Sequence, residues 1–159
     1  MKRTVLVFIS ALLVFLLVSC GSSSAKDSNF VRFEMEDGNV FYIELYPAVA
    51  PETVKNFKKL VSEGFYDGII FHRVSAGVLI QGGDPTGTGY YGSDKKINGE
   101  FSSNGFTNDL KHTVGVVSMA RSRDYNSASS QFFVCVRDMP TLDGDYAAFG
   151  KVIPCRCIF

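Results

Sequence analysis

Short apolar runs separated by turn-forming residues occupy most of the chain between residues 31 and 152. The runs are rich in Val, Ile and Phe and cover residues 31–35, 40–45, 69–74, 78–81, 114–120, 131–136 and 147–152. Runs this short, bounded by Gly, Asp, Asn or Ser, are typical of β-strands. The first two runs flank Asp37-Gly38, which favours a tight hairpin turn. We therefore expect a mainly β fold.

One segment follows a helical period instead. Pro51 suits the first turn of a helix, and Gly64 suits the position just after its end. Between them, apolar residues recur at the spacing of one helix face, namely Val54, Phe57, Leu60 and Val61. The stretch from residue 82 to residue 113 is rich in Gly, Ser, Asn and Asp and is expected to be mostly loop. Many short strands with one helix predict a closed β-barrel with the helix packed over an end.

The first residues have the pattern of an export signal. Lys2 and Arg3 precede an apolar run over residues 5–18, which is shorter than the roughly 20 residues that a membrane span needs. The sequence Leu-Val-Ser-Cys that ends at Cys20 resembles a bacterial lipobox, in which the peptide is cut before the cysteine and the sulfur receives a lipid. We expect residues 1–19 to be a lipoprotein signal peptide, with an ordinary signal peptide as the alternative.

The resemblance to a lipobox divides the chain into three parts. Residues 20–29 are small and polar and are expected to form a flexible tether that begins at the lipidated Cys20. Residues 30–159 then form the folded domain. The expected location is the periplasmic or extracellular face of a bacterial cell membrane, with the bilayer as a partner through Cys20.

Charge, cysteine content and glycine spacing argue against several other functions, namely binding of nucleic acid, a metal or a dinucleotide. The chain has 16 basic and 16 acidic residues, so it offers no excess of positive charge for nucleic acid. Cys155 and Cys157 lack partner ligands at metal-site spacing, and Cys135 lies in an apolar run, where a small core residue is expected. The Gly-rich segment 87–92 does not join a strand to a helix, as a dinucleotide site requires. We expect no metal and no cofactor, and a monomer.

Two segments contain the candidate catalytic residues. Residues 71–84 read Phe-His-Arg-Val-Ser-Ala-Gly-Val-Leu-Ile-Gln-Gly-Gly-Asp, and residues 118–133 begin Ser-Met-Ala and end Ser-Gln-Phe-Phe. They supply a cation at Arg73, an amide at Gln81 and an aromatic ring at Phe133, with no evident nucleophile. The hydrolase pattern Gly-x-Ser-x-Gly is absent from the sequence. This set favours a pocket that holds a peptide and acts on it electrostatically.

Both segments resemble the signature blocks of the cyclophilin family of peptidyl-prolyl isomerases. The resemblance runs from about residue 31 to residue 152 and implies an eight-stranded barrel capped by two helices, with the site on its outer wall. In that family the strand ending in Phe-Gly-Lys-Val is followed by a second helix and a closing strand. Here residues 149–152 are followed by only seven residues, so we expect a barrel that lacks the second helix and the last strand.

The resemblance implies that the chain speeds rotation about X-Pro bonds in proline-containing segments of exported proteins as they fold. Arg73 would donate a hydrogen bond near the prolyl nitrogen and carbonyl, Gln81 would bind the substrate backbone, and Phe133 would help to form the proline pocket. The same resemblance implies a set of substrate-binding residues, namely Val78, Leu79, Ala120, Arg121, Ser122, Gln131, Leu142 and Tyr146.

Several of these positions depart from the commonest form of the family motif. Val78 and Leu79 stand where phenylalanine and methionine are usual, so the pocket stays apolar with a changed fit. Arg121, Thr141 and Tyr146 replace asparagine, tryptophan and histidine, and loss of the indole at position 141 implies weak cyclosporin binding. The alternative function is a non-catalytic module for proline-containing segments, or an inactive remnant of a cyclophilin.

Overall fold

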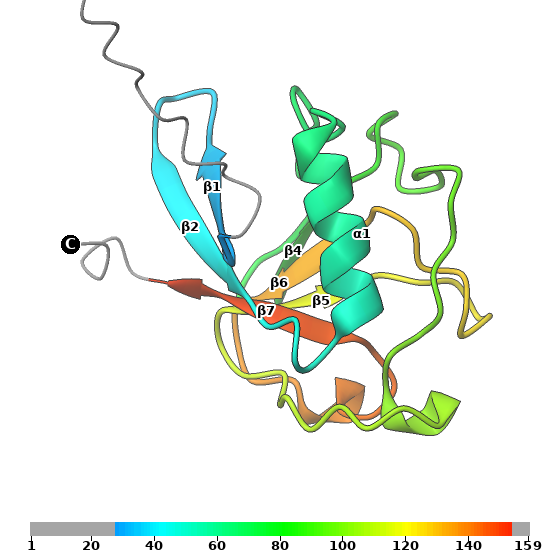
Figure 1. Ribbon diagram of the computed structural model, residues 1–159. Helices are drawn as coiled ribbons and strands as arrows, with labels where there is room; N and C mark the ends of the chain where they lie inside the picture. Colours follow the sequence, from blue (N-terminus) through cyan, green and yellow to red (C-terminus); the bar gives the residue numbers. More distant parts are fainter. Residues whose placement is uncertain (1–27, 154–159) are drawn as a thin grey trace, which may run out of the picture.

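Seven strands form one antiparallel sheet in the computed structural model, which describes residues 28–153. The order across the sheet is β1-β2-β7-β5-β6-β4-β3, and Figure 1 shows its curled form. The bounds are β1 (Phe30–Glu34), β2 (Val40–Leu45), β3 (Arg73–Ser75), β4 (Leu79–Gly82), β5 (Val116–Met119), β6 (Phe132–Cys135) and β7 (Ala148–Ile153). The predicted signal peptide, the lipidated Cys20 and the pair Cys155 and Cys157 lie outside the described residues.

The predicted hairpin and helix are both confirmed. β1 and β2 pair with Phe33 opposite Phe41, and Gly38 turns between them with a φ of 81°, which a glycine adopts without strain. The helix α1 (Pro51–Ser62) begins at Pro51. The Glu100 carboxylate, from a distant loop, accepts hydrogen bonds from the backbone N–H groups of Glu52 and Thr53 at 2.9 and 2.8 Å. This carboxylate therefore caps the start of the helix.

The main core lies between α1 and the inner face of the sheet. Phe57 of the helix packs against Phe132 of β6 and Phe149 of β7, with ring centroids 5.5 and 5.1 Å apart. Side chains alternate along β6, so Phe132 and Val134 belong to this core while Phe133 and Cys135 belong to a second cluster. The second cluster occupies the opposite face of the sheet, where the candidate site lies.

The sheet remains open between its two outer strands, β1 and β3. Within residues 28–153 no pairing joins these two strands, and a single α-helix is present. This agrees with the prediction of a cyclophilin-like barrel without its second helix and last strand, and it corrects the closed barrel expected from strand count alone.

Two local predictions needed correction. The strand expected over residues 69–74 begins only at Arg73, because β4 ends at Gly82 and the register of the two strands would place residues 69–71 opposite residues 83–85, beyond that end. The expected loop region contains a 3-10 turn (Ser102–Asn104), and a second turn (Pro140–Leu142) precedes β7. No helix within the described part of the chain is long and apolar enough to cross a bilayer.

Candidate active site

Arg73, Gln81 and Phe133 lie in one row across the sheet. Arg73 of β3 is directly opposite Gln81 of β4, and Gln81 is directly opposite Phe133 of β6. The row continues to Ser118 of β5. Residues directly opposite one another point to the same face of an antiparallel sheet. The structure therefore brings the three predicted catalytic residues together on the outer face, in the order cation, amide, aromatic ring.

A chain of hydrogen bonds fixes the polar half of the row. Arg73 Nη1 donates to Gln81 Oε1 at 3.3 Å, and Gln81 Nε2 donates to Gln131 Oε1 at 2.8 Å. Gln131 Nε2 in turn donates to the carbonyl oxygens of Gly89 and Tyr91 at 3.0 and 2.7 Å. Because both amide protons of Gln131 are used there, its oxygen must face Gln81, and the oxygen of Gln81 must face Arg73. The exposed guanidinium keeps further donors available for a ligand.

The loop that anchors this chain is organised around a buried carboxylate. Asp84 is 1% exposed and accepts hydrogen bonds from the backbone N–H groups of Thr86, Gly89 and Tyr91 at 2.8, 2.6 and 3.2 Å. Burial acts to raise the pKa of Asp84, but the hydrogen bonds donated by Thr86, Tyr91 and Gly89 outweigh it and hold the pKa well below its usual range. Asp84 thus fixes the two carbonyl groups that orient Gln131.

The apolar half of the site is a cluster on the same face. Leu79 and Phe133 are buried within it, and the partly buried residues packed around them include Val78, Ala120, Leu142 and Tyr146. The rings of Phe133 and Tyr146 meet edge to face with centroids 5.9 Å apart. Burial raises the pKa of the Cys135 thiol at the base of this cluster to about 11, so it stays protonated at neutral pH. The arrangement forms an apolar patch beside the polar chain.

Three polar residues form a support behind Phe133, with His112 and Ser118 buried and Asp143 partly exposed. His112 Nδ1 lies 3.0 Å from Asp143 Oδ1, and His112 Nε2 lies 2.9 Å from Ser118 Oγ. The imidazole stacks on the Phe133 ring at 6.1 Å between centroids. The spacing of residues 112, 118 and 143 in the sequence does not predict this contact. Only the fold shows that the histidine lies between a carboxylate and a hydroxyl group.

These three residues support the site and do not form a hydrolase triad. Ser118 is fully buried, so no substrate carbonyl can reach its oxygen as a hydrolase mechanism requires. Burial lowers the pKa of His112, against the opposing effect of Asp143, and favours the neutral ring. In that form Nδ1–H donates to Asp143 and Nε2 accepts from the Ser118 hydroxyl. This network holds the imidazole flat against Phe133.

Arg121 and Ser122 lie at the rim of the site. The guanidinium carbon of Arg121 lies 4.6 Å from the centroid of Tyr146 and 4.8 Å from that of Tyr125, and its Nε donates to the carbonyl of Asp145 at 2.9 Å. Arg121 therefore braces Tyr146. The Ser122 backbone N–H donates to Ser127 Oγ at 2.9 Å. Ala120 donates its N–H to the Gln131 carbonyl at 3.0 Å, which ties this segment to the polar chain.

Comparison with known families identifies the family to which this fold belongs. A family model described as "Cyclophilin type peptidyl-prolyl cis-trans isomerase/CLD" matches residues 30–158. The chain belongs to the cyclophilin family.

Curated relatives of this cyclophilin come from several kinds of organism. It is 47% identical to peptidyl-prolyl cis-trans isomerase B of Bacillus subtilis over 120 residues, which is 76% of this chain and 80% of the relative. It is 43% identical to a peptidyl-prolyl cis-trans isomerase of Helicobacter pylori over 124 residues, covering 77% and 72% of the two chains. Both bacterial relatives carry the name of an isomerase.

A solved structure gives the same fold. The crystal structure of a Cryptosporidium parvum cyclophilin type isomerase, determined in the presence of the dipeptide Ala-Pro, superposes on this cyclophilin with a TM-score of 0.71. The two share 36% sequence identity over 80% of each chain. The cyclophilin fold expected from the sequence motifs is confirmed.

The residues that depart from the family motif lie around the pocket. Leu79 is buried beside Phe133, and Val78 lies at the border of the same cluster. Thr141 is exposed within the turn Pro140–Leu142, directly before Leu142. The substitutions therefore change the interior of the apolar pocket at Leu79 and its border at Val78 and Thr141, and they leave the row from Arg73 to Phe133 intact.

Proposed function

We propose that this cyclophilin accelerates rotation about X-Pro bonds of exported proteins, with Arg73, Gln81 and Phe133 as its catalytic residues. The observation that supports the proposal most directly is their placement in one row, with a fixed donor at one end and an apolar ring at the other. Membership of an isomerase family supports the reaction class.

The chemistry follows from the nature of the barrier. A planar X-Pro amide crosses a barrier of about 20 kcal/mol, and at the top its nitrogen lone pair is localised and can accept a hydrogen bond. A catalyst needs to bind the twisted amide better than either planar form. No nucleophile or proton transfer is required.

Each part of the site has a role in this scheme. Phe133, Leu79 and Leu142 would hold the proline ring, because they form the apolar cluster. Arg73 would then donate to the prolyl nitrogen or carbonyl as the amide twists. Gln81 and Gln131, already held by the polar chain, would bind the flanking backbone.

Further residues would complete the substrate site. Val78 and Tyr146 would border the proline pocket, and Ala120, Arg121 and Ser122 would line the path of the residues before proline. A proline-containing segment is the proposed ligand. The Cryptosporidium parvum relative, studied with Ala-Pro, supports this choice of ligand class.

The cellular setting is a separate proposal from the sequence. Residues 1–19 would direct export, Cys20 would carry a lipid, and residues 20–29 would tether the domain to the membrane. Metabolic labelling with an alkyne-modified palmitate tests this in bacteria that express the full chain. Label on the wild type and none on Cys20→Ala is the expected result, and an unlabelled wild type would refute the anchor.

Substitution of Arg73 tests the catalytic assignment. Arg73→Ala should reduce kcat/KM for an Ala-Pro peptide about 100- to 1,000-fold, equivalent to about 3–4 kcal/mol of transition-state stabilisation. Binding of the same peptide should fall much less. Arg73→Lys is the matched control, because it keeps the charge and loses the planar fork of donors. Equal losses of binding and turnover in Arg73→Ala would favour the non-catalytic binding module instead.

A further inference from the structure

The rim of the active-site cluster carries a guanidinium group enclosed by aromatic rings. Three rings lie against the guanidinium carbon of Arg121 with their centroids 5.2, 4.8 and 4.6 Å away, namely Phe101, Tyr125 and Tyr146. Its Nε donates to the Asp145 carbonyl and its Nη1 donates to the Ser122 carbonyl, both at 2.9 Å. These contacts hold the group in one orientation, so little side-chain freedom remains to be lost when a ligand binds.

The charge of Arg121 has no anionic partner within residues 28–153. The side chain is partly buried, and no carboxylate of these residues forms an ion pair with it. The acidic side chains of the adjoining segments are engaged elsewhere. Asp124 Oδ1 accepts from the Asn126 N–H at 2.9 Å, and Asp145 Oδ1 accepts from the Ser103 hydroxyl at 2.6 Å. A cation that is partly removed from water and unpaired favours an anion supplied by a ligand.

One nitrogen of this guanidinium keeps both of its donors. Nη2 donates to no group in the described part of the chain, where Nε and Nη1 make the hydrogen bonds of Arg121. Nη2 is also not among the side-chain atoms that are buried there without a partner, so it is open to solvent. A carboxylate that accepts from Nη2 would form a charge-assisted hydrogen bond, which is roughly twice as strong as a neutral one.

Arg121 lies one aromatic ring away from the proline pocket. Tyr146 meets Phe133 edge to face at 5.9 Å between centroids, and the guanidinium lies over the same Tyr146 ring. The preceding residue, Ala120, is bonded through its N–H to the Gln131 carbonyl at 3.0 Å. A peptide whose proline ring contacts Phe133, and whose preceding residues run along the segment 120–122, therefore brings those residues close to Nη2.

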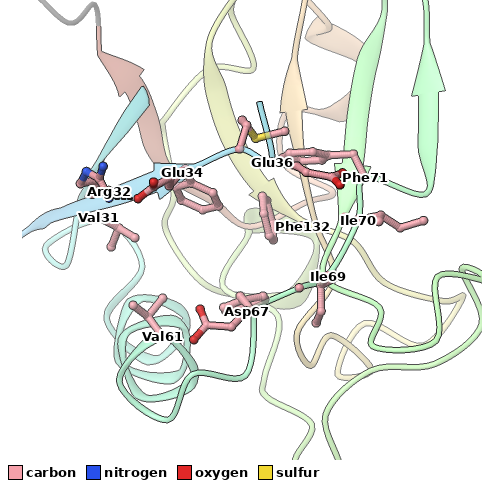
Figure 2. Close-up of a pocket in the computed structure, with 16 residues that line it drawn as sticks. Val31, Arg32, Glu34, Glu36, Val61, Asp67, Ile69, Ile70, Phe71 and Phe132 are labelled. Carbon is pink, nitrogen blue, oxygen red and sulfur yellow. Dashed lines mark hydrogen bonds and ion pairs between the residues drawn. The ribbon is translucent and has the colours of Figure 1, made fainter. Parts of the chain in front are cut away.

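The cavity on the other face of the sheet does not take part in this contact. It has a volume of about 740 Å³, and Figure 2 shows Val31, Phe71 and Phe132 around it. Side chains alternate along β6, so Phe132 points to the main core while Phe133 points to the outer face. Contacts with a peptide beyond the proline pocket therefore come from the rim of the outer face, where Arg121 lies.

We propose that Arg121 determines substrate specificity by selecting peptides with a carboxylate side chain at one of the two positions before the proline. This assignment rests on the proposed function, which places the proline at Phe133. A glutamate or aspartate at one of these positions accepts from Nη2 and supplies the missing anion. Arg73 is not its partner, because Gln81 lies between Arg73 and Phe133 in the row across the sheet.

Matched peptides that differ in one charge test the preference. Two pairs of end-blocked peptides carry Glu or Gln at the first or at the second position before proline, and NMR exchange with the full-length chain gives kcat/KM at low salt. In at least one pair the Glu peptide should have a kcat/KM about 3- to 10-fold higher than the Gln peptide. About 1 M NaCl should remove most of this difference, because it shortens the screening length to about 3 Å. Equal values within both pairs would overturn the proposal.

Variants assign the preference to one side chain. Arg121→Gln should abolish it, and Arg121→Lys should retain part of it, since the charge stays while the planar fork of donors is lost. Arg121→Glu should favour a Lys peptide over the Gln peptide. Arg123→Gln is the matched control, because it removes an exposed positive charge two residues further along the chain, and it should leave the preference unchanged. A preference that persists in Arg121→Gln, or disappears in Arg123→Gln, would place the contact elsewhere and overturn the proposal.

Binding measurements separate this inference from the proposed catalysis. NMR titration gives the Kd of each peptide without any turnover, and circular dichroism melting checks that each variant is folded. Absence of acceleration for every peptide would refute the proposed function alone. Tighter binding of the Glu peptide than of the Gln peptide, seen in the wild type and lost in Arg121→Gln, would then still support the specificity of Arg121. Equal Kd values for Glu and Gln peptides in the wild type would refute that specificity, whether or not the peptides are isomerised.

Discussion

Gln131 offers a test of whether the polar chain positions the catalytic arginine. Gln131→Leu removes the donor to the Gly89 and Tyr91 carbonyls and the acceptor for Gln81, at 3.0, 2.7 and 2.8 Å. The contact with Tyr91 is exposed, so water can replace part of what is lost. The bond to Gln81 is partly buried, and its removal lets the Gln81 amide rotate away from Arg73.

The expected size of this effect follows from the number of bonds that water cannot replace. One to two hydrogen bonds with a net value of about 1 kcal/mol each correspond to a loss of about 5- to 30-fold in kcat/KM. The assay is the cis–trans exchange rate of an Ala-Pro peptide measured by NMR. Gln131→Glu is the companion variant, because it keeps the shape but places a carboxylate against two carbonyl oxygens. It should lose at least as much activity as Gln131→Leu. Wild-type activity in both variants would refute the positioning role.

Three further substitutions probe the supports around the site. Asp84→Asn should lower the free energy of unfolding at neutral pH by about 1–3 kcal/mol, because the neutral amide accepts fewer hydrogen bonds. Because the pKa of Asp84 is lower in the folded than in the unfolded state, its stabilising contribution is present above about pH 4, the unfolded pKa, and is lost as the pH falls toward the folded pKa. The free energy of unfolding, measured by urea denaturation from pH 7 to pH 3, should therefore depend less on pH in the variant than in the wild type. The same pH dependence in both proteins would contradict this. Ser118→Ala should leave the buried His112 Nε2 without its donor, at a cost of about 1–3 kcal/mol measured by thermal melting, and a stability equal to wild type would refute the supporting network. Arg121→Ala removes the cation that braces Tyr146, so KM for the peptide should rise a few-fold with little change in kcat, and a selective fall in kcat would argue for a direct catalytic role.

Local patterns in the sequence were sufficient to predict the hairpin and the helix. Asp37-Gly38 turns β1 into β2, and the stretch between Pro51 and Gly64 forms α1, since these features depend on residues near one another in the chain. The spacing of Arg73 and Gln81 was also informative, because the two strands form a hairpin that places them opposite. The family motif added Phe133, which the sheet order places next to Gln81.

Features that depend on distant contacts could not be predicted. The ladder that would have extended β3 back to residue 69 is absent from the described structure because β4 ends at Gly82. The contact of His112 with Ser118 and Asp143 joins three separate segments, so it has no sequence pattern. The capture of three loop N–H groups by Asp84 likewise required the fold of residues 84–91.

The central claim is that the row on the outer face of this open sheet forms a working isomerase site. The most direct measurement is the exchange rate of an Ala-Pro peptide in the presence of the folded full-length chain, with Arg73→Ala alongside. We expect acceleration by the wild type that falls about 100- to 1,000-fold in the variant. No acceleration by folded wild-type protein, or equal acceleration by both proteins, would contradict the account.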